Sequence, residues 1–185
     1  VGTDRPLTLY MMDHGYYDVI YLDKPRGESV SPAQVDTWLD TFETQAPDAN
    51  VNVIVEACHS GSFIQEAQSI SGDGRVVIAS TSTTRVARAS GTGALFSDHF
   101  LTALQRGESL YGSFETARAA VAQSYPYQVP WLDDNGNALA NASNDGKLAA
   151  QRGFAFVGTL AEEAWPPYIV ETVCPDTITH GRGEI

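Results

Sequence analysis

The stretch VIVEACHSGSF, residues 53–63, runs from an apolar segment into a cluster of reactive and small residues. Its first part belongs to a β-prone run, NVNVIV (50–55), which predicts a buried strand. Cys58 follows that strand, just ahead of the turn-forming pair Ser60 and Gly61. Ligand and catalytic groups of open α/β sheets lie beyond the carboxyl ends of the strands. Cys58 is therefore a candidate nucleophile as well as a candidate core residue.

Predicted strands and helices alternate along the chain on both sides of this stretch. LTLYMM (7–12) and RVVIAS (75–80) predict two more core strands, and YYDVIYL (16–22) predicts a hairpin partner for the first. Amphipathic spacing predicts helices at 32–43, where Ser31 is the N-cap and Gln34 completes a capping box, and at 62–70, 96–107 and 109–123. Strands joined through such helices predict an α/β fold with a mostly parallel sheet flanked by helices.

The composition excludes several classes of function. With 185 residues and 43% hydrophobic content, the chain is long enough for one α/β domain with a sizeable core and a short extension. The formal net charge of -12 argues against a surface for nucleic acid or anionic lipid, because phosphate binding needs a basic field. Cys58 and Cys174 make neither a disulfide framework nor a CxxC metal motif. No apolar run is long enough to predict a membrane-spanning segment.

A second reactive residue, His14, follows the first predicted strand. A right-handed crossover through the helix at 32–43 would make this strand and the Cys58 strand parallel neighbours, so that both residues emerge at one sheet edge. There an imidazolium and a helix N-terminus favour the thiolate of Cys58. Backbone amides around Gly15 and the turn at Ser60 would form an oxyanion hole, worth about 3 kcal/mol per donor. The sequence thus predicts a nucleophilic thiol with His14 as the proton carrier.

Other interpretations of these residues stay open. A cysteine after an apolar strand is commonly an inert core residue, and a histidine before a glycine commonly lies in a turn. Their joint placement at two strand ends favours the catalytic pair. A metal hydrolase using Asp13, His14 and His59 is a further alternative, although adjacent residues rarely converge on one ion and the chain has no HExxH spacing.

The motifs LTLYMMDHG (7–15) and VIVEACHSGSF (53–63) resemble the His-Gly and Glu-Ala-Cys-x-Ser-Gly-Ser motifs of the legumain family of cysteine peptidases, as found in a bacterial or archaeal relative. RVVIASTSTTRVA (75–87) and GALFSDHF (93–100) resemble the next strand and helix entry of that family. The similarity covers about residues 7–123. It implies the caspase-like fold, a three-layer sandwich in which helices cover both faces of the sheet.

This resemblance also implies a reaction and a set of site residues. The chain would be an endopeptidase that cleaves peptide or protein substrates through a thioester at Cys58, with His14 as general base and acid. The backbone amides of Gly15 and Cys58 would form the oxyanion hole, Ser97 would line the primary specificity pocket, and Glu56 would contribute to substrate binding. Legumain relatives cleave after Asn or Asp, and other relatives of the fold cleave after Arg or Lys, so the P1 residue stays open. No cofactor is implied.

The same fold and residues are compatible with two other functions. An amine in place of water would resolve the thioester by transpeptidation. A catalytically idle adhesion or scaffold module of a cell-surface protein would keep the fold without turnover. An inert, buried Cys58 would be the feature that distinguishes it from an enzyme.

Both ends of the chain depart from the family pattern. Caspase-like domains normally place a strand, a helix and a second strand ahead of the His-bearing strand, which this chain reaches at residue 7. We therefore expect residues 1–164 to form the peptidase domain without those strands, with a missing N-terminal segment or another chain covering the sheet edge. Residues 165–185 predict a linker and the start of an immunoglobulin-like β-sandwich, which favours an extracellular or cell-surface parent.

The segment 124–146 lacks periodicity and is long for a loop inside a compact domain. Its oxygen-bearing side chains have the 1, 3, 5 and 9 spacing of a Ca²⁺ loop at Asp133, Asn135, Asn137 and Asn141. Ala138 replaces the usual glycine, and position 12 is Asn144 instead of a glutamate. A loop of plain Asx turns is therefore the main interpretation, and structural Ca²⁺ is the alternative.

Overall fold

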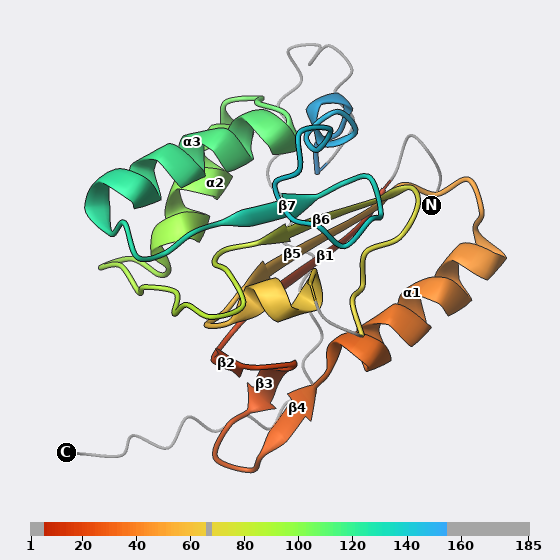
Figure 1. Ribbon diagram of the computed structural model, residues 1–185, viewed down its shortest axis with the longest axis horizontal. Coiled ribbons are helices and arrows are strands. Elements are labelled where there is room, and N and C mark those ends of the chain that lie inside the picture. The colour runs from red at the N-terminus through yellow and green to blue at the C-terminus, as the bar shows by residue number, and fades with distance from the viewer. Residues whose placement is uncertain (1–5, 66–67, 155–185) are drawn as a thin grey trace.

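The computed structural model describes residues 6–65 and 68–154. Its central sheet has the strand order β1-β5-β6-β7, with β1 at Leu7–Met12, β5 at Val51–Glu56, β6 at Arg75–Ala79 and β7 at Trp131–Asp133. The first three strands are parallel, and β7 is antiparallel to β6. Figure 1 shows α1 (Pro32–Gln45) on one face, and α2 (Leu95–Gln105) and α3 (Leu110–Ser124) on the other. The predicted α/β sandwich with a mostly parallel sheet is confirmed.

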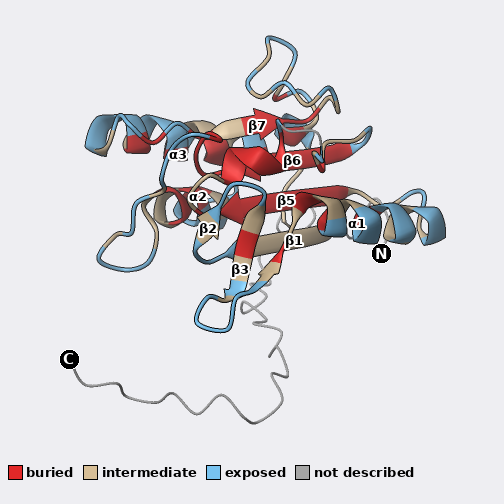
Figure 2. Ribbon diagram, turned by 60° about the horizontal axis from the view of Figure 1, so that its bottom comes forward, coloured by how far each residue is buried: buried red, intermediate tan, exposed pale blue. Residues whose placement is uncertain are grey.

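Two hydrophobic cores lie on opposite faces of the sheet because side chains alternate along its strands. Val53 and Val55 of β5 face α1 and pack in one cluster with Val35 and Leu39. Ile54 between them faces α2 and α3, and packs in the other cluster with the aromatic residues Phe96, Phe100 and Phe114. Figure 2 shows that burial is concentrated in β5 and β6, while the outer faces of the helices are exposed. The centre of the sheet is thus rigidly packed on both sides.

Helix α1 begins where the sequence predicts it. The Ser31 hydroxyl accepts from the amide of Gln34, whose side chain accepts from the amide of Ser31, so the capping box is complete. Val35 and Leu39 of the predicted apolar face are buried, but Trp38 is 55% exposed. The apolar stripe is therefore narrower than its sequence spacing predicts.

The strand predicted as the hairpin partner of β1 belongs to a separate small sheet. This sheet consists of β2 (Gly15–Tyr16), β3 (Val19–Asp23) and β4 (Glu28–Val30), and β3 pairs with β2 and β4 rather than with β1. Ile20 and Val30 bury their side chains in the core beneath α1. The hairpin prediction is wrong because the burial of these two side chains against α1 holds the segment away from the edge of the main sheet, so that it does not pair with β1.

The helix predicted over 62–70 is also not observed. In its place, Ser60–Phe63 form a short 3₁₀ helix, and none of the described residues 64–65 and 68–70 is helical. The amide of Ile70 donates to the carbonyl of Phe63, and both side chains are buried. The apolar spacing in this segment therefore reflects the packing of a compact loop, and the large helix dipole expected beside Cys58 is reduced to one short turn.

The segment 124–146 contains β7, a strand that sequence periodicity does not reveal because it is only three residues long. A second 3₁₀ helix follows at Ala149–Gln151. The proposed linker and β-sandwich at 165–185 lie outside the described residues, as does the end of the proposed peptidase domain after residue 154. Within the described part of the chain, no helix is both long enough and apolar enough to cross a membrane.

Candidate active site

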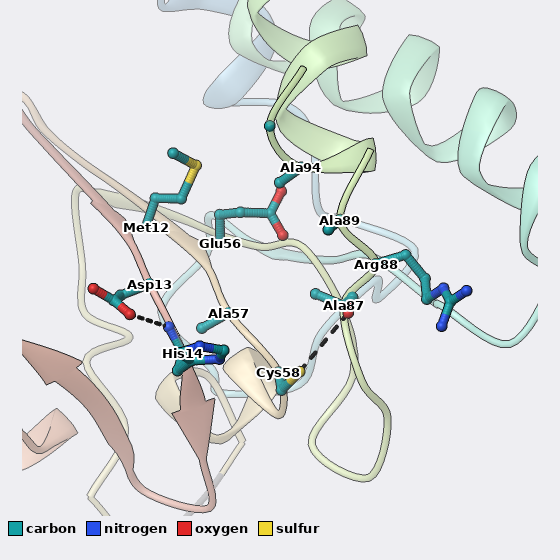
Figure 3. A pocket seen from close by; sticks show the side chains of 11 residues that line it. Met12, Asp13, His14, Glu56, Ala57, Cys58, Ala87, Arg88, Ala89 and Ala94 are labelled. Atoms are coloured by element: carbon teal, nitrogen blue, oxygen red, sulfur yellow. Dashed lines mark hydrogen bonds between the residues drawn. The ribbon is translucent and has the colours of Figure 1, made fainter. Parts of the chain in front are cut away.

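The parallel pairing of β1 with β5 brings the two predicted reactive residues to one edge of the sheet. Met12 lies opposite Glu56 at the end of the ladder, and the amide of Asp13 donates to the carbonyl of Glu56 at 3.3 Å. Beyond this point both strands end. His14 and Cys58 then line one pocket with a volume of about 500 Å³ (Figure 3). His14 is exposed, and the Cys58 thiol is free and half-buried.

Gly15 approaches the backbone of Cys58 more closely than a residue with a side chain could. A Cβ atom at Gly15 would lie 2.5 Å from the carbonyl oxygen of Cys58 and 2.8 Å from the Cβ of Ala57. The amide of Asp18 also donates to Ser62 Oγ at 3.1 Å, which ties the β2–β3 turn to the segment after Cys58. The two chain segments that carry His14 and Cys58 are therefore in direct contact.

Glu56 lies on the Ala94 side of the pocket (Figure 3). Its Oε2 accepts from the amide of Ser97 at 3.0 Å and from the Ser97 hydroxyl at 2.7 Å. The Tyr10 hydroxyl donates to Ser97 Oγ at 2.6 Å, which completes a chain of three side chains. Glu56 Oε1 is buried, and no hydrogen bond of ordinary geometry joins it to the described residues, but the Ser80 side chain lies close enough to lower the pKa of this carboxyl. Burial raises the pKa of the Glu56 carboxyl, and this effect exceeds that of the hydrogen bonds it accepts.

The segment between β6 and α2 forms the wall of the pocket that faces β1. It presents the small side chains of Ala87, Ala89 and Ala94. The amide of Arg88 donates to Oε1 of the buried Gln128 at 3.0 Å, and Gln128 Nε2 donates to the carbonyl of Ser80 at 2.9 Å. Cys58 Sγ lies 3.8 Å from the carbonyl oxygen of Ala87. Gln128 thus fastens this wall to the end of β6.

A family model described as the peptidase C13 family matches residues 2–130. The chain belongs to the peptidase C13 family. The match includes both strand ends and the wall of the pocket, as the legumain-like motifs of the sequence predict. A search of the curated proteins found no match.

The caspase-like fold is confirmed by a solved structure. Caspase-1 from Spodoptera frugiperda matches with a TM-score of 0.55 and 14% sequence identity. The match covers 72% of this chain and 62% of the caspase chain. At this identity, the likeness establishes the shared fold of the C13 chain and the caspase and nothing about substrate.

Among the candidate residues of this C13 chain, Gly15, Ser97 and His59 do not line the pocket; Gly15 lies beside it, against the Cys58 carbonyl. Ser97 is buried and lies behind Glu56, so that it reaches the pocket only through that carboxyl. His59 has a left-handed φ of 59°, and its Nδ1 lies 2.8 Å from the carbonyl oxygen of Thr83. The His59 ring packs against Tyr17, with their centroids 4.5 Å apart. His59 is therefore part of an aromatic cluster separate from the pocket.

The predicted metal-ligand candidates of the C13 chain mainly bond to backbone amides. Asp13 Oδ1 accepts from the amide of His14 at 2.5 Å. In the loop after β7, side-chain oxygens accept backbone amides at Asp133, Asn135, Asn137 and Asn141. The bonds that Asp133, Asn135 and Asn137 accept from the amide two residues further on are Asx turns, which organise the backbone of this loop. Within residues 6–65 and 68–154, no group of three or more His, Cys, Asp or Glu residues is placed to hold a metal.

Sequence reasoning missed Tyr10, Arg88 and Gln128, although each contributes to the surroundings of the pocket. Tyr10 stands inside the apolar run of β1, and Gln128 stands between the prolines of YPYQVP (125–130). A hydroxyl or amide within an apolar segment is a usable signal, because a buried polar group needs a hydrogen-bond partner. Arg88 offers no comparable pattern, since its position depends on the fold of the whole wall segment.

Proposed function

We propose that the chain is a cysteine endopeptidase in which Cys58 is the nucleophile and His14 is the general base and acid. The observation that carries this proposal is the presence of both side chains in one pocket, at the ends of neighbouring parallel strands. Membership of a peptidase family supports the same class of reaction. A thiol that is half-buried but open to a pocket of this volume remains accessible to a peptide.

In the proposed reaction, His14 takes the thiol proton and the Cys58 sulfur attacks the carbonyl carbon of the scissile bond. A C–S bond forms, and the carbonyl electron pair moves to the oxygen, which the amides of Gly15 and Cys58 stabilise. The C–N bond then breaks as His14 gives its proton to the leaving amine, and a thioester remains. Water then attacks the thioester carbonyl carbon and gives a proton to His14, so that a C–O bond forms; the C–S bond breaks to release the carboxylic acid, and His14 returns the proton to the Cys58 sulfur.

The pocket also suggests the kind of side chain that is bound at P1. Glu56 Oε1 is a buried acceptor that makes no hydrogen bond of ordinary geometry with the described residues, and the nearby wall presents the small side chains of Ala87, Ala89 and Ala94. An unsatisfied buried acceptor costs about 1–3 kcal/mol, so a P1 side chain that donates hydrogen bonds is favoured. Asn, Lys and Arg supply such donors, whereas the carboxylate of Asp would meet the carboxyl of Glu56.

The experiment that tests the function is the hydrolysis of fluorogenic peptides that carry Asn, Lys, Arg, Asp or Ala at P1. The wild-type protein is compared with Cys58→Ala, and Cys174→Ala is the matched control because it removes the chain's other cysteine. We expect cleavage of donor-bearing P1 peptides by the wild-type and control proteins and its loss in Cys58→Ala. Adding a peptide amine as acceptor separates hydrolysis from transpeptidation.

The opposite result would support the idle scaffold module. In that case all three proteins would leave every peptide intact, and Cys58 would resist alkylation by iodoacetamide at neutral pH. The alkylation arm is needed because it measures access to the thiol without requiring the correct peptide sequence.

A further inference from the structure

Beside the active-site pocket, the segment between β6 and α2 carries two exposed arginines, Arg85 and Arg88. Together with Tyr125 and Tyr127 they form a patch that we call the arginine–tyrosine surface. We propose that this surface binds a carboxylate side chain of the substrate upstream of the scissile bond, at P2 to P4. The inference rests on the proposed peptidase function and names the substrate class of that site as acidic peptides.

The Arg88 side chain is held in a defined position. Figure 3 shows it leaving the alanine wall on the side away from Cys58. Its guanidinium carbon lies 4.8 Å from the ring centroid of Tyr125, in a cation–π contact. Its backbone amide is fixed by the buried Gln128. Stacking occupies one face of the guanidinium, and its N–H edge makes no hydrogen bond with the described residues; this is the edge that binds a carboxylate through two hydrogen bonds.

A second hollow adjoins the contact between Arg88 and Tyr125. It has a volume of about 370 Å³ and is lined by Thr84, Arg85, Val86, Tyr125 and Tyr127. Tyr125 therefore belongs to this hollow and also contacts Arg88, which lines the active-site pocket. The two hollows are lined by successive residues of one short stretch of backbone, 84–86 for the second hollow and 87–89 for the active-site pocket. A peptide bound in the active-site pocket and extended along this wall reaches the second hollow, since three extended residues span about 10 Å.

This surface carries two neighbouring exposed arginines in a chain that is acidic overall. The chain has 23 acidic and 11 basic residues. Arg26, Arg75 and Arg118 are paired with carboxylates, whereas neither Arg85 nor Arg88 forms an ion pair with the described residues. The two arginines beside the pocket are thus available to pair with a carboxylate of a bound substrate. A Lys or Arg side chain of a substrate at this place would be repelled.

The test is a set of fluorogenic peptides with one fixed P1 residue and Ala, Asp or Lys placed singly at P2, P3 and P4. For each enzyme, kcat/KM of the best Asp peptide is divided by that of the all-Ala peptide, so a general loss of activity cancels. We expect a ratio of about threefold to tenfold in the wild type, and a ratio near one in Arg88→Gln or Arg85→Gln. Arg106→Gln is the matched control, because Arg106 is an exposed arginine at the far end of α2.

A binding measurement separates this inference from the proposed function. Fluorescence anisotropy of the same peptides, labelled and titrated with Cys58→Ala protein, reports the Asp preference without turnover. Low salt strengthens the preference, because ions screen exposed charges. If the wild type cleaves nothing while anisotropy still shows a preference that depends on Arg88, the peptidase proposal fails and the carboxylate site stands. Equal binding of Asp and Ala peptides, or an Asp preference unchanged in both arginine variants, would overturn the inference.

Discussion

The two strand ends that meet at the pocket are held by the protein in different ways. Every residue of β5 is buried, and Glu56 at its end is hydrogen-bonded to Ser97 of α2. Among the described strands, β1 lies at the edge of the main sheet and has intermediate exposure, and His14 beyond its end is exposed. The proposed nucleophile and the P1 pocket thus adjoin the buried core, whereas the proposed base lies at the exposed rim of the pocket. Changes at the β1 end should therefore affect chemistry alone, and changes at the β5 end should affect chemistry and stability together.

Replacing His14 by Gln should produce the largest effect on rate in this comparison. General acid–base catalysis by a positioned side chain contributes about 10²- to 10⁴-fold, so kcat/KM should fall by that factor. The melting temperature should hardly change, because exposed side chains contribute little to the free energy of unfolding. His99→Gln on α2 serves as the control and should keep both values. A His14 variant that melts far below the wild type would show that the rim end is structural after all.

Gly15→Ala probes the contact between the two strand ends. The added methyl group would meet the Cys58 carbonyl oxygen and the Ala57 Cβ, so β2 has to move away from Cys58. Displacing an oxyanion-hole donor costs about 10²- to 10³-fold in kcat, and we expect a loss in that range. Gly91→Ala is a matched control, since a Cβ there would meet nothing within 4 Å. Equal activity of both variants would contradict the proposed oxyanion role of Gly15.

The difference between the two strand ends also explains what the sequence could predict. The apolar run of β5 and the capping box of α1 are local signals, and they placed the parallel β1–β5 pair and the shared edge correctly. Gly15 and Cys58 could be named because each follows a strand. The sequence could not show that Ser97 stands behind Glu56, because that depends on where α2 begins relative to a strand distant in the chain.

Short segments were the main source of error. β7 and the 3₁₀ helix after Cys58 are too short for periodicity to identify, and their conformation is set by packing against β6. For the same reason, the sequence predicts one strand over 16–22 as a partner of β1, where the structure has parts of β2 and β3, and it does not predict β4. Tertiary burial of Ile20 and Val30, rather than local preference, decides where this part of the chain lies.

Glu56→Gln tests the buried end through substrate preference. The amide can still accept from Ser97 through its oxygen, and it places an NH₂ group at the position of Oε1, so that a donor replaces an acceptor there. Peptides with a P1 donor should lose about tenfold in kcat/KM, while a P1 acceptor such as Asp should gain. Measuring both peptides in one enzyme makes the result independent of folding yield. An unchanged P1 order would remove Glu56 from the proposed pocket.

The same variant should change how stability depends on pH. The pKa of Glu56 is raised in the folded protein, so the folded state holds its proton at pH values where the unfolded chain has lost it. The wild type is therefore stabilised by this group below its ordinary pKa, and loses that contribution as the pH rises toward the raised value. Melting temperatures across this window should fall less with pH in Glu56→Gln than in the wild type. Parallel curves would contradict the assignment of a raised pKa.

Ser97→Ala should give the smallest effect on rate and the most specific one. The variant removes one of the two donors to Glu56 Oε2 and the acceptor of the Tyr10 hydroxyl, which should cost about 1–2 kcal/mol of stability. Loss of a donor to the carboxylate also raises the pKa of Glu56 further, so cleavage that needs the ionised form should shift to higher pH. A few-fold increase in KM for donor-bearing P1 peptides should accompany this shift.

Ser113→Ala provides the control, because Ser113 is a buried serine of α3 whose hydroxyl makes no hydrogen bond with the described residues. Its pH profile should match the wild type. A Ser97 variant that loses stability but keeps the wild-type pH profile would mean that Ser97 only packs the interior. A shifted profile would mean that the buried Ser97 controls the ionisation of Glu56 and thereby substrate binding. This influence of a buried residue on the site would distinguish the β5 end from the exposed end that carries His14.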